Sequence, residues 1–206
     1  MQNHWLEWAR KIKALSQVGK TYTKDPYDLE RYNQLEALVH EIFAKAGGKN
    51  ITEVSDFFFP DEGYATPKID LRGGVIKDDK ILLVKERSNE KWTLPGGWAD
   101  VCESGKEGIE REVLEESGFK VNATKLVAIK DRNKYPYRSY FPHHVYKIFY
   151  LCEIISGAPK ENIEISDIRF FEGNAMPELS TERVLPEDIE IIFKYHEDKN
   201  LPTFFD

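Results

Sequence analysis

The segment from Gly97 to Phe119 constrains the fold of this chain more than any other part of its sequence. Ser104 and Glu107 have the spacing of a capping box, in which the two side chains close the start of a helix reciprocally. Gly118 stands where such a helix would end, because glycine readily adopts the left-handed conformation of a C-terminal cap. The sequence therefore predicts a helix over residues 105–117 with both ends specified locally.

Three glutamates crowd one surface of this predicted helix. Glu112, Glu115 and Glu116 stand at positions i, i+3 and i+4, which are neighbours on a helix surface. Each like-charge pair costs roughly 0.2–0.5 kcal/mol, and the helix dipole also disfavours anions in its C-terminal half. A hard cation with oxygen ligands, such as Mg²⁺, would relieve both effects. Because an acidic helix face is more often a solvated surface, the crowding alone indicates a metal site only weakly.

Short apolar runs and alternating apolar residues surround this helix and predict a mixed sheet. We expect strands near residues 69–76, 81–84, 92–94, 121–130, 143–155 and 167–172, and a last helix from Pro186 to about His196. Because strands and helices interleave along the chain, the fold class is α/β or α+β.

The N-terminal part of the chain has a purely helical pattern. Trp5, Trp8, Ile12 and Leu15 recur at three- and four-residue spacing, which predicts one apolar stripe of a helix. A second helix is expected from Asp25, as its N-cap, to the glycines at 47–48, and a third short helix over 52–58. We therefore expect three parts, with these bounds: a helical domain over 1–60, a linker over 61–67, and a larger domain over 68–206.

Composition narrows the classes of partner. The 206 residues carry 29 Lys and Arg against 36 Asp and Glu, a net charge of −7, so a nucleic-acid partner is not expected. An apolar run of about 18 residues is absent, and the N-terminus has neither a basic region nor an apolar core, so we expect no membrane span and no secretory signal. The two cysteines, Cys102 and Cys152, are typical of a protein in the reducing cytoplasm.

The full spacing around the acidic helix changes the interpretation of its glutamates. Gly97, five residues, Glu103, seven residues and then the run 111–119 (Arg-Glu-Val-Leu-Glu-Glu-Ser-Gly-Phe) resemble the Nudix box at every defining position. Seven fixed identities at a frequency of roughly 0.06 each would coincide by chance in about one in a million chains of this length. The resemblance covers residues 68–197 and implies a Nudix α/β/α sandwich with a mixed sheet, preceded here by a small all-helical domain.

The resemblance also implies an activity and a set of site residues. Nudix enzymes hold one or more Mg²⁺ or Mn²⁺ ions against a pyrophosphate, and the metal polarises the phosphoryl oxygen and assists deprotonation of the attacking water. The positions that match the family's metal-binding acids are Glu112, Glu115 and Glu116, and the carbonyl of Gly96 matches a backbone ligand of some members. Arg111 and Glu103 match a pair that orients the carboxylates.

The general base stays open between two positions. Some family members use the acid that corresponds to Glu112, and others use an acid in a later loop. Glu164 is the leading downstream candidate because it precedes the expected strand over 167–172, whereas Glu153 and Glu161 are weaker ones. An ordinary surface role for Glu164 fits the sequence equally well.

Residues outside the box suggest a substrate class. The helical extension, the linker run Gly-Tyr-Ala-Thr-Pro-Lys at 63–68 and the run Leu-Pro-Gly-Gly-Trp-Ala-Asp-Val at 94–101 resemble one bacterial branch of the family. Its members act on X-linked nucleoside diphosphates, including ADP-ribose and CDP-choline, and release a nucleoside monophosphate and phosphorylated X. The alternatives are a pyrophosphatase that removes damaged nucleoside triphosphates, and a non-catalytic module that senses nucleotide sugars. The latter is disfavoured because every acid of the box is present.

Two further features suggest contacts with ligands and partners. Tyr137, Arg138 and Tyr140 lie in an aromatic, partly basic loop and are candidates for stacking on a base or choline group and for meeting a phosphate, although such aromatics also pack on domain surfaces. The N-terminal helices carry more apolar residues than two short helices can bury between themselves. They pack either on the rest of the chain or across a two-fold axis, and we favour a homodimer.

Overall fold

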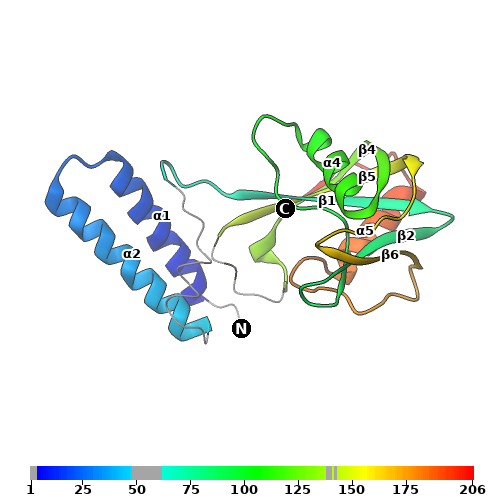
Figure 1. The fold of residues 1–206 in the computed structure, drawn as a ribbon. Helices are drawn as coiled ribbons and strands as arrows, with labels where there is room; N and C mark the ends of the chain where they lie inside the picture. The colour runs from blue at the N-terminus through cyan, green and yellow to red at the C-terminus, as the bar shows by residue number, and fades with distance from the viewer. Residues whose placement is uncertain (1–3, 48–61, 138–140, 142) are drawn as a thin grey trace. The chain divides into compact units, whose positions relative to one another are not determined.

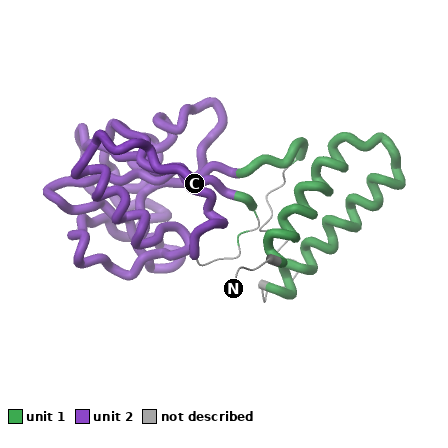
Figure 2. The backbone as a smooth tube through the Cα atoms, turned by 180° about the vertical axis from the view of Figure 1, so that it is seen from behind, with its two compact units in different colours: residues 1–67, 139–144 green, residues 68–138, 145–206 purple. Residues whose placement is uncertain are grey.

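The computed structural model describes residues 4–47, 62–137, 141 and 143–206. The chain divides into two compact units (Figure 2). The helical unit comprises Met1–Pro67 with Ser139–His144, and the sheet unit comprises Lys68–Arg138 with Val145–Asp206. The short helix expected over 52–58 lies outside the described residues.

The helical unit contains two long helices, α1 (His4–Tyr22) and α2 (Pro26–Gly47), joined by a three-residue connection into an antiparallel hairpin (Figure 1). Asp25 caps α2 as expected, because its carboxylate accepts a hydrogen bond from the Tyr27 amide at 2.7 Å. The helices approach closely at Gly19, where an added Cβ would lie 2.3 Å from the Tyr32 ring. Val39 and Phe43 belong to the small apolar core between the helices.

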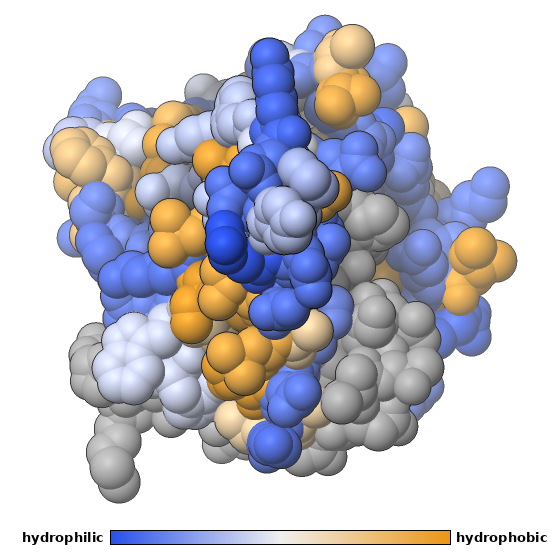
Figure 3. Space-filling view, turned by 90° about the vertical axis from the view of Figure 1, so that its left-hand side faces the viewer, coloured by the Kyte–Doolittle hydropathy of each residue, from blue (hydrophilic) through white to orange (hydrophobic). Residues whose placement is uncertain are grey.

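The surface of the hairpin exposes several large apolar side chains. Trp8, Leu15 and Tyr22 follow one another at seven-residue spacing on α1, and 62%, 69% and 66% of their surfaces are exposed. Leu35 and Leu38 on α2 are also exposed. Residues seven apart lie on nearly the same side of a helix, so the three α1 residues form one exposed apolar stripe. The single stripe expected from the sequence is therefore divided, because Trp5 and Ile12 pack against the core between the helices whereas Trp8 and Leu15 are exposed. In the space-filling view, orange hydrophobic patches interrupt the blue hydrophilic surface (Figure 3).

The sheet unit contains seven strands in the described residues. They are β1 (Lys68–Lys77), β2 (Lys80–Glu86), β3 (Trp92–Thr93), β4 (Phe119–Asp131), β5 (Val145–Gly157), β6 (Ile165–Glu172) and β7 (Phe204–Phe205). Their order is β3-β2-β1-β5-β4-β7, and β6 lies off this path and pairs with β2 in antiparallel orientation. The sheet is mixed, because β1 and β5 run parallel whereas β4 and β5 run antiparallel.

Helices cover both faces of the sheet, α4 (Gly105–Ser117) on one and α5 (Pro186–Glu197) on the other. The alternation of side chains along a strand separates the two cores. Leu151 on β5 packs in the core that contains α5 residues, and its neighbour Cys152 packs in the core that contains Ile109 and Val113 of α4. This arrangement confirms the expected α/β/α sandwich.

The expected elements of the sheet unit are present, with two additions that we did not expect. These are a short 3₁₀ helix, η1 (Arg132–Lys134), and the two-residue strand β7, which pairs in parallel with β4. None of the helices in the described part of the chain is long and apolar enough to cross a membrane.

Candidate active site

Helix α4 has the local signals that its sequence predicts. The Ser104 hydroxyl accepts a hydrogen bond from the Glu107 amide, and the Glu107 carboxylate accepts one from the Ser104 amide at 2.8 Å. Gly118 closes the other end in the left-handed conformation, with φ 78°. Ile109 and Val113 pack in the core against the sheet. This packing fixes the rotation of α4 about its own axis and therefore the direction of its acidic face.

The loop at residues 94–97 lies against strand β1. The amides of Leu71 and Gly73 donate to the carbonyls of Gly97 and Pro95, at 2.8 and 2.9 Å. Gly96 has a φ of 140°, and a Cβ there would lie 2.0 Å from the Leu71 carbonyl oxygen. Only glycine fits this close approach, which explains the glycine at this position.

The loop and α4 meet at two glutamates. The Gly96 amide donates a hydrogen bond to the Glu116 carboxylate at 2.8 Å. A Cβ on Gly97 would lie 3.0 Å from a carboxylate oxygen of Glu112. The structure therefore brings Gly96, Glu112 and Glu116 together, as the Nudix-box resemblance implies.

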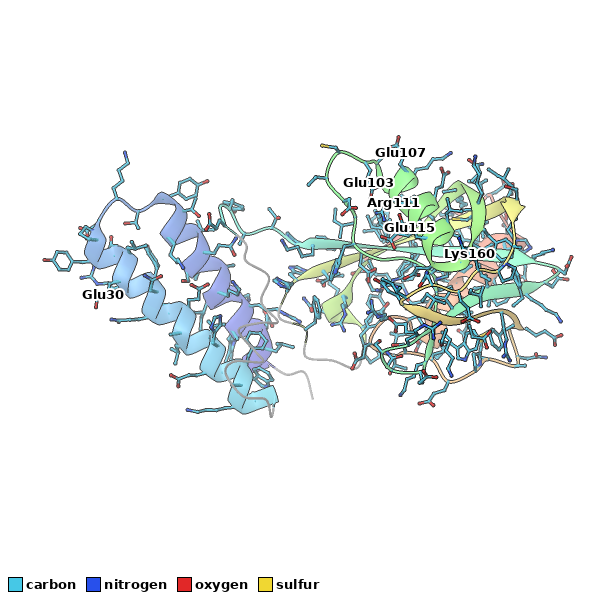
Figure 4. The ribbon with its side chains drawn as sticks, in the orientation of Figure 1. Glu30, Glu103, Glu107, Arg111, Glu115 and Lys160 are labelled. Carbon is cyan, nitrogen blue, oxygen red and sulfur yellow. The ribbon has the colours of Figure 1, made fainter. Side chains whose placement is uncertain are left out.

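Arg111 connects the remaining acids. Its guanidinium donates two hydrogen bonds to Glu103, at 2.8 and 3.1 Å. A third nitrogen donates to Glu112 at 2.9 Å and to Glu115 at 3.1 Å. Figure 4 shows Glu103, Arg111 and Glu115 close to one another beside α4. One guanidinium thus fixes three carboxylates, and bidentate pairing of this kind is geometrically specific.

The two innermost carboxyls have raised pKa values. Burial raises the pKa of Glu116 to about 7, although Arg72 and the Gly96 amide oppose the shift. Burial also raises the pKa of Glu112, against the effect of Arg111. The opposite shift occurs at Glu103, where hydrogen bonds from Arg111 and from the Asp100 amide lower the pKa to about 2. Perturbed carboxyls of this kind are typical of functional sites.

The donor set suits a hard cation. Glu112 and Glu116 present carboxylate oxygens that burial makes costly to ionise, and a divalent ion would offset that cost. Across residues 4–47, 62–137, 141 and 143–206, no group of three or more Asp, Glu, His or Cys side chains is arranged to hold a metal ion. Glu112 and Glu115 instead turn toward Arg111. Mg²⁺ typically takes only one or two carboxylates beside water and phosphate oxygens, so the pair at Glu112 and Glu116 fits it.

The downstream base candidate lies in a loop that is tied to α4. The Asn162 side chain donates to the Glu115 carbonyl at 2.6 Å, and the Lys160 amide donates to the Ser117 carbonyl at 3.1 Å. Glu164 is exposed at the end of this loop, where its amide and its carbonyl are bound by Asn162 and Arg87. The weaker candidates Glu153 and Glu161 form ion pairs with Lys199 and Arg87.

Of the three loop residues suggested as substrate contacts, the structure describes one. Tyr137 is buried, and its hydroxyl donates to Asp188 at 2.6 Å. Its ring lies beside Arg132, whose guanidinium carbon is 5.3 Å from the ring centroid. Arg138 and Tyr140 lie outside the described residues.

Sequence reasoning missed a charged residue beside the loop. Arg72 is 2% exposed, and it donates to Asp70 at 2.8 Å and to the Leu94 carbonyl at 3.1 Å. The available signal was an Asp and an Arg two apart in an otherwise apolar strand, which places both on one buried face.

Comparison with known proteins agrees with the two-unit organisation. A family model described as the NUDIX domain matches residues 70–192. A second model, described as the UDP-X-like, N-terminal oligomerisation domain, matches residues 3–58.

Relatives match over the whole length of the chain. A Bacillus subtilis protein provisionally named ADP-ribose pyrophosphatase is 36% identical over 206 residues, which is 100% of this chain and 99% of that protein. A crystal structure of a UDP-X diphosphatase superposes with a TM-score of 0.64 at 33% identity and covers 100% of this chain and 99% of its own. The crystal structure of an ADP-ribose pyrophosphatase from Streptococcus suis, at 36% identity and a TM-score of 0.63, covers 68% of this chain and 100% of its own. The chain therefore belongs to the Nudix hydrolase family.

Proposed function

We propose that this protein is a Mg²⁺- or Mn²⁺-dependent pyrophosphohydrolase of X-linked nucleoside diphosphates of the ADP-ribose or CDP-choline type. The observation that carries the proposal is the meeting of the Gly96 loop with Glu112 and Glu116, two half-buried residues whose carboxyls have raised pKa values. The products would be a nucleoside monophosphate and the phosphorylated X group.

In this proposal the acids of α4 hold the metal. Glu112, Glu116 and the Gly96 carbonyl would be its ligands, and Glu115 would join them by turning away from Arg111. The ion would supply Lewis-acid stabilisation of the charge that develops on the phosphate. The Gly96 amide keeps the Glu116 carboxylate aimed at the loop. Arg111, held by Glu103, orients Glu112 and Glu115. Support of this kind fixes ligand geometry before the substrate arrives.

We assign the general base to Glu164. Its exposed carboxylate stands in the loop that Asn162 fastens to α4, so it can accept a proton from a water that approaches the diphosphate from solvent. The alternative base is Glu112, which is already bound by Arg111. A carboxylate that both holds metal and accepts the proton would have to leave one role to serve the other, and this favours Glu164.

The substrate class is supported by relatives that match over the full length. Their names refer to ADP-ribose and to UDP-X. We infer a linked diphosphate as the substrate and leave the choice of X to experiment, because a shared fold does not determine the substrate.

A substrate panel tests the proposal. ADP-ribose, CDP-choline, UDP-sugars and oxidised nucleoside triphosphates are incubated with the enzyme and Mg²⁺ or Mn²⁺, and the released nucleotide is quantified. We expect nucleoside monophosphate from at least one linked diphosphate and none when EDTA is present. Turnover confined to triphosphates would replace this proposal with the removal of damaged nucleotides. Tight binding of a nucleotide sugar without turnover would indicate a sensing module.

We also propose that the protein is a homodimer through the helical unit. The apolar stripe at Trp8, Leu15 and Tyr22 is larger than a monomeric hairpin would ordinarily expose to water. The family model that matches this part of the chain is described as an oligomerisation domain. A second copy of the chain would bury the stripe against its own equivalent, as an isologous interface requires.

A further inference from the structure

Arg72 joins strand β1 to the loop of the proposed metal site. Its guanidinium is buried and donates to the Leu94 carbonyl at 3.1 Å, two residues before Gly96. On either side of Arg72, the amides of Leu71 and Gly73 bond the same loop at 2.8 and 2.9 Å. Three successive residues of β1 therefore hold residues 94–97.

Arg72 is itself held in place by a carboxylate. Asp70 accepts a hydrogen bond from Arg72 Nε at 2.8 Å, and its other oxygen accepts one from Lys147 Nζ on β5. Burial alone would raise the pKa of Asp70, but Arg72 and Lys147 outweigh it and leave the pKa lowered. The three side chains thus form a buried ion triad in which one carboxylate binds both cations.

The loop of residues 94–97 has little freedom to move between β1 and α4. Gly96 lies so close to β1 that an added Cβ would be 3.0 Å from the Arg72 Cα. Its amide reaches Glu116 on the opposite side. A small shift of the loop would therefore move both the Gly96 carbonyl and the hydrogen bond that aims Glu116.

We propose that Arg72 is a positioning residue for the metal site, and that the triad of Asp70, Arg72 and Lys147 holds the Gly96 loop at its working distance from Glu116. The inference rests on the proposed function, because it assumes that Gly96 and Glu116 bind the metal.

Charge and positioning can be separated by a variant that keeps the charge. The positive charge of Arg72 acts on Glu116, so its loss changes metal binding in two opposed ways: a cation no longer repels the metal, but Glu116 holds a proton more readily. Loss of a group that holds a ligand loop weakens metal binding, and support of this kind is worth about 10- to 100-fold in metal affinity. A variant that keeps the charge but loses the hydrogen bonds to the loop therefore identifies the role.

The experiment measures Mn²⁺ binding to the full-length chain by electron paramagnetic resonance, without substrate. Arg72→Met removes the charge and the hydrogen bonds. Arg72→Lys keeps the charge but cannot reproduce the planar fork that reaches both Asp70 and Leu94. The matched control is Lys130→Met, which removes another buried cation on the α5 face of the sheet, paired with Asp188 at 2.7 Å. Circular dichroism establishes that each variant is folded.

We expect both Arg72 variants to bind Mn²⁺ about 10- to 100-fold more weakly than the wild type, and Lys130→Met to bind it unchanged. Equal or tighter binding by either folded Arg72 variant overturns the inference, as does equal weakening in Lys130→Met. If Arg72→Met does not fold, Arg72→Lys decides in the same way. The wild type and Glu116→Gln separate the test of the metal site from the test of Arg72. A wild type that binds no Mn²⁺ refutes the proposed metal site itself. Normal binding by Arg72→Met beside lost binding by Glu116→Gln refutes only the role of Arg72.

Discussion

Glu116, a proposed metal ligand, makes the stability of the fold depend on pH. Its pKa is about 7 in the fold, against an ordinary value of 4.5. A carboxyl whose pKa is raised by folding stabilises the protein at pH values below 4.5, and this contribution is lost as the pH rises through 7. The shift corresponds to about 3 kcal/mol at alkaline pH. This contribution of Glu116 therefore makes the fold less stable at alkaline pH than at acid pH.

Replacing this acid should separate stability from activity. We expect Glu116→Gln to lower turnover at least ~10²-fold, because a ligand of the proposed metal is lost. The metal-free variant should nevertheless unfold at a higher temperature than the metal-free wild type at pH 8, and at a similar temperature at pH 4. Thermal unfolding in EDTA measures this effect. A variant that is less stable than wild type at pH 8 would contradict the raised pKa of Glu116.

The assignment of the base can be tested at a second residue. We expect Glu164→Gln to lower kcat about 10²- to 10⁴-fold with little change in KM, because proton transfer is impaired and binding is not. Steady-state rates over a range of pH provide the measurement, and Glu161→Gln in the same loop is the control. Near-normal kcat in Glu164→Gln, together with a severe loss in Glu112→Gln, would move the role to Glu112.

At the scale of elements, helix α4 depends on its first turn. Ser104→Ala removes the hydroxyl that accepts from the Glu107 amide at 3.2 Å. We expect a loss of about 1 kcal/mol in the free energy of unfolding. Chemical denaturation measures this free energy from the unfolding transition of the sheet unit. Ser88→Ala, in an exposed turn, is the control. A loss no larger than that of Ser88→Ala would show that packing alone holds the helix start.

The elements that the sequence predicted well are those with local signals. Helix α4 has a capping box and a terminal glycine, so both of its ends could be predicted. Strand β7 could not, because its two residues become a strand only by pairing with Ala128 and Ile129, far away along the chain. The same holds for Arg72, whose contact with Leu94 depends on how the loop lies on β1. The residues of the Nudix box could be predicted from their spacing in the sequence. The residues that hold them in position could not, because those contacts depend on the tertiary structure.

At the scale of the whole molecule, the apolar stripe of α1 tests the oligomeric state. We expect Leu15→Glu to convert the dimer to a monomer, because it introduces a charge into the proposed interface. Light scattering coupled to size-exclusion chromatography measures the mass. Ile155→Glu is the control, since Ile155 is comparably exposed but lies on β5. A wild-type chain that is monomeric at high concentration would end the proposal.

Arg111 also has a consequence for how the enzyme is activated. One nitrogen of its guanidinium lies between Glu112 and Glu115 and compensates part of their charge. The proposed metal would then bind to carboxylates that Arg111 already positions, and helix α4 would not have to form around the ion. We expect such a site to take up and release metal quickly, so that the activity would follow the free Mg²⁺ level of its surroundings.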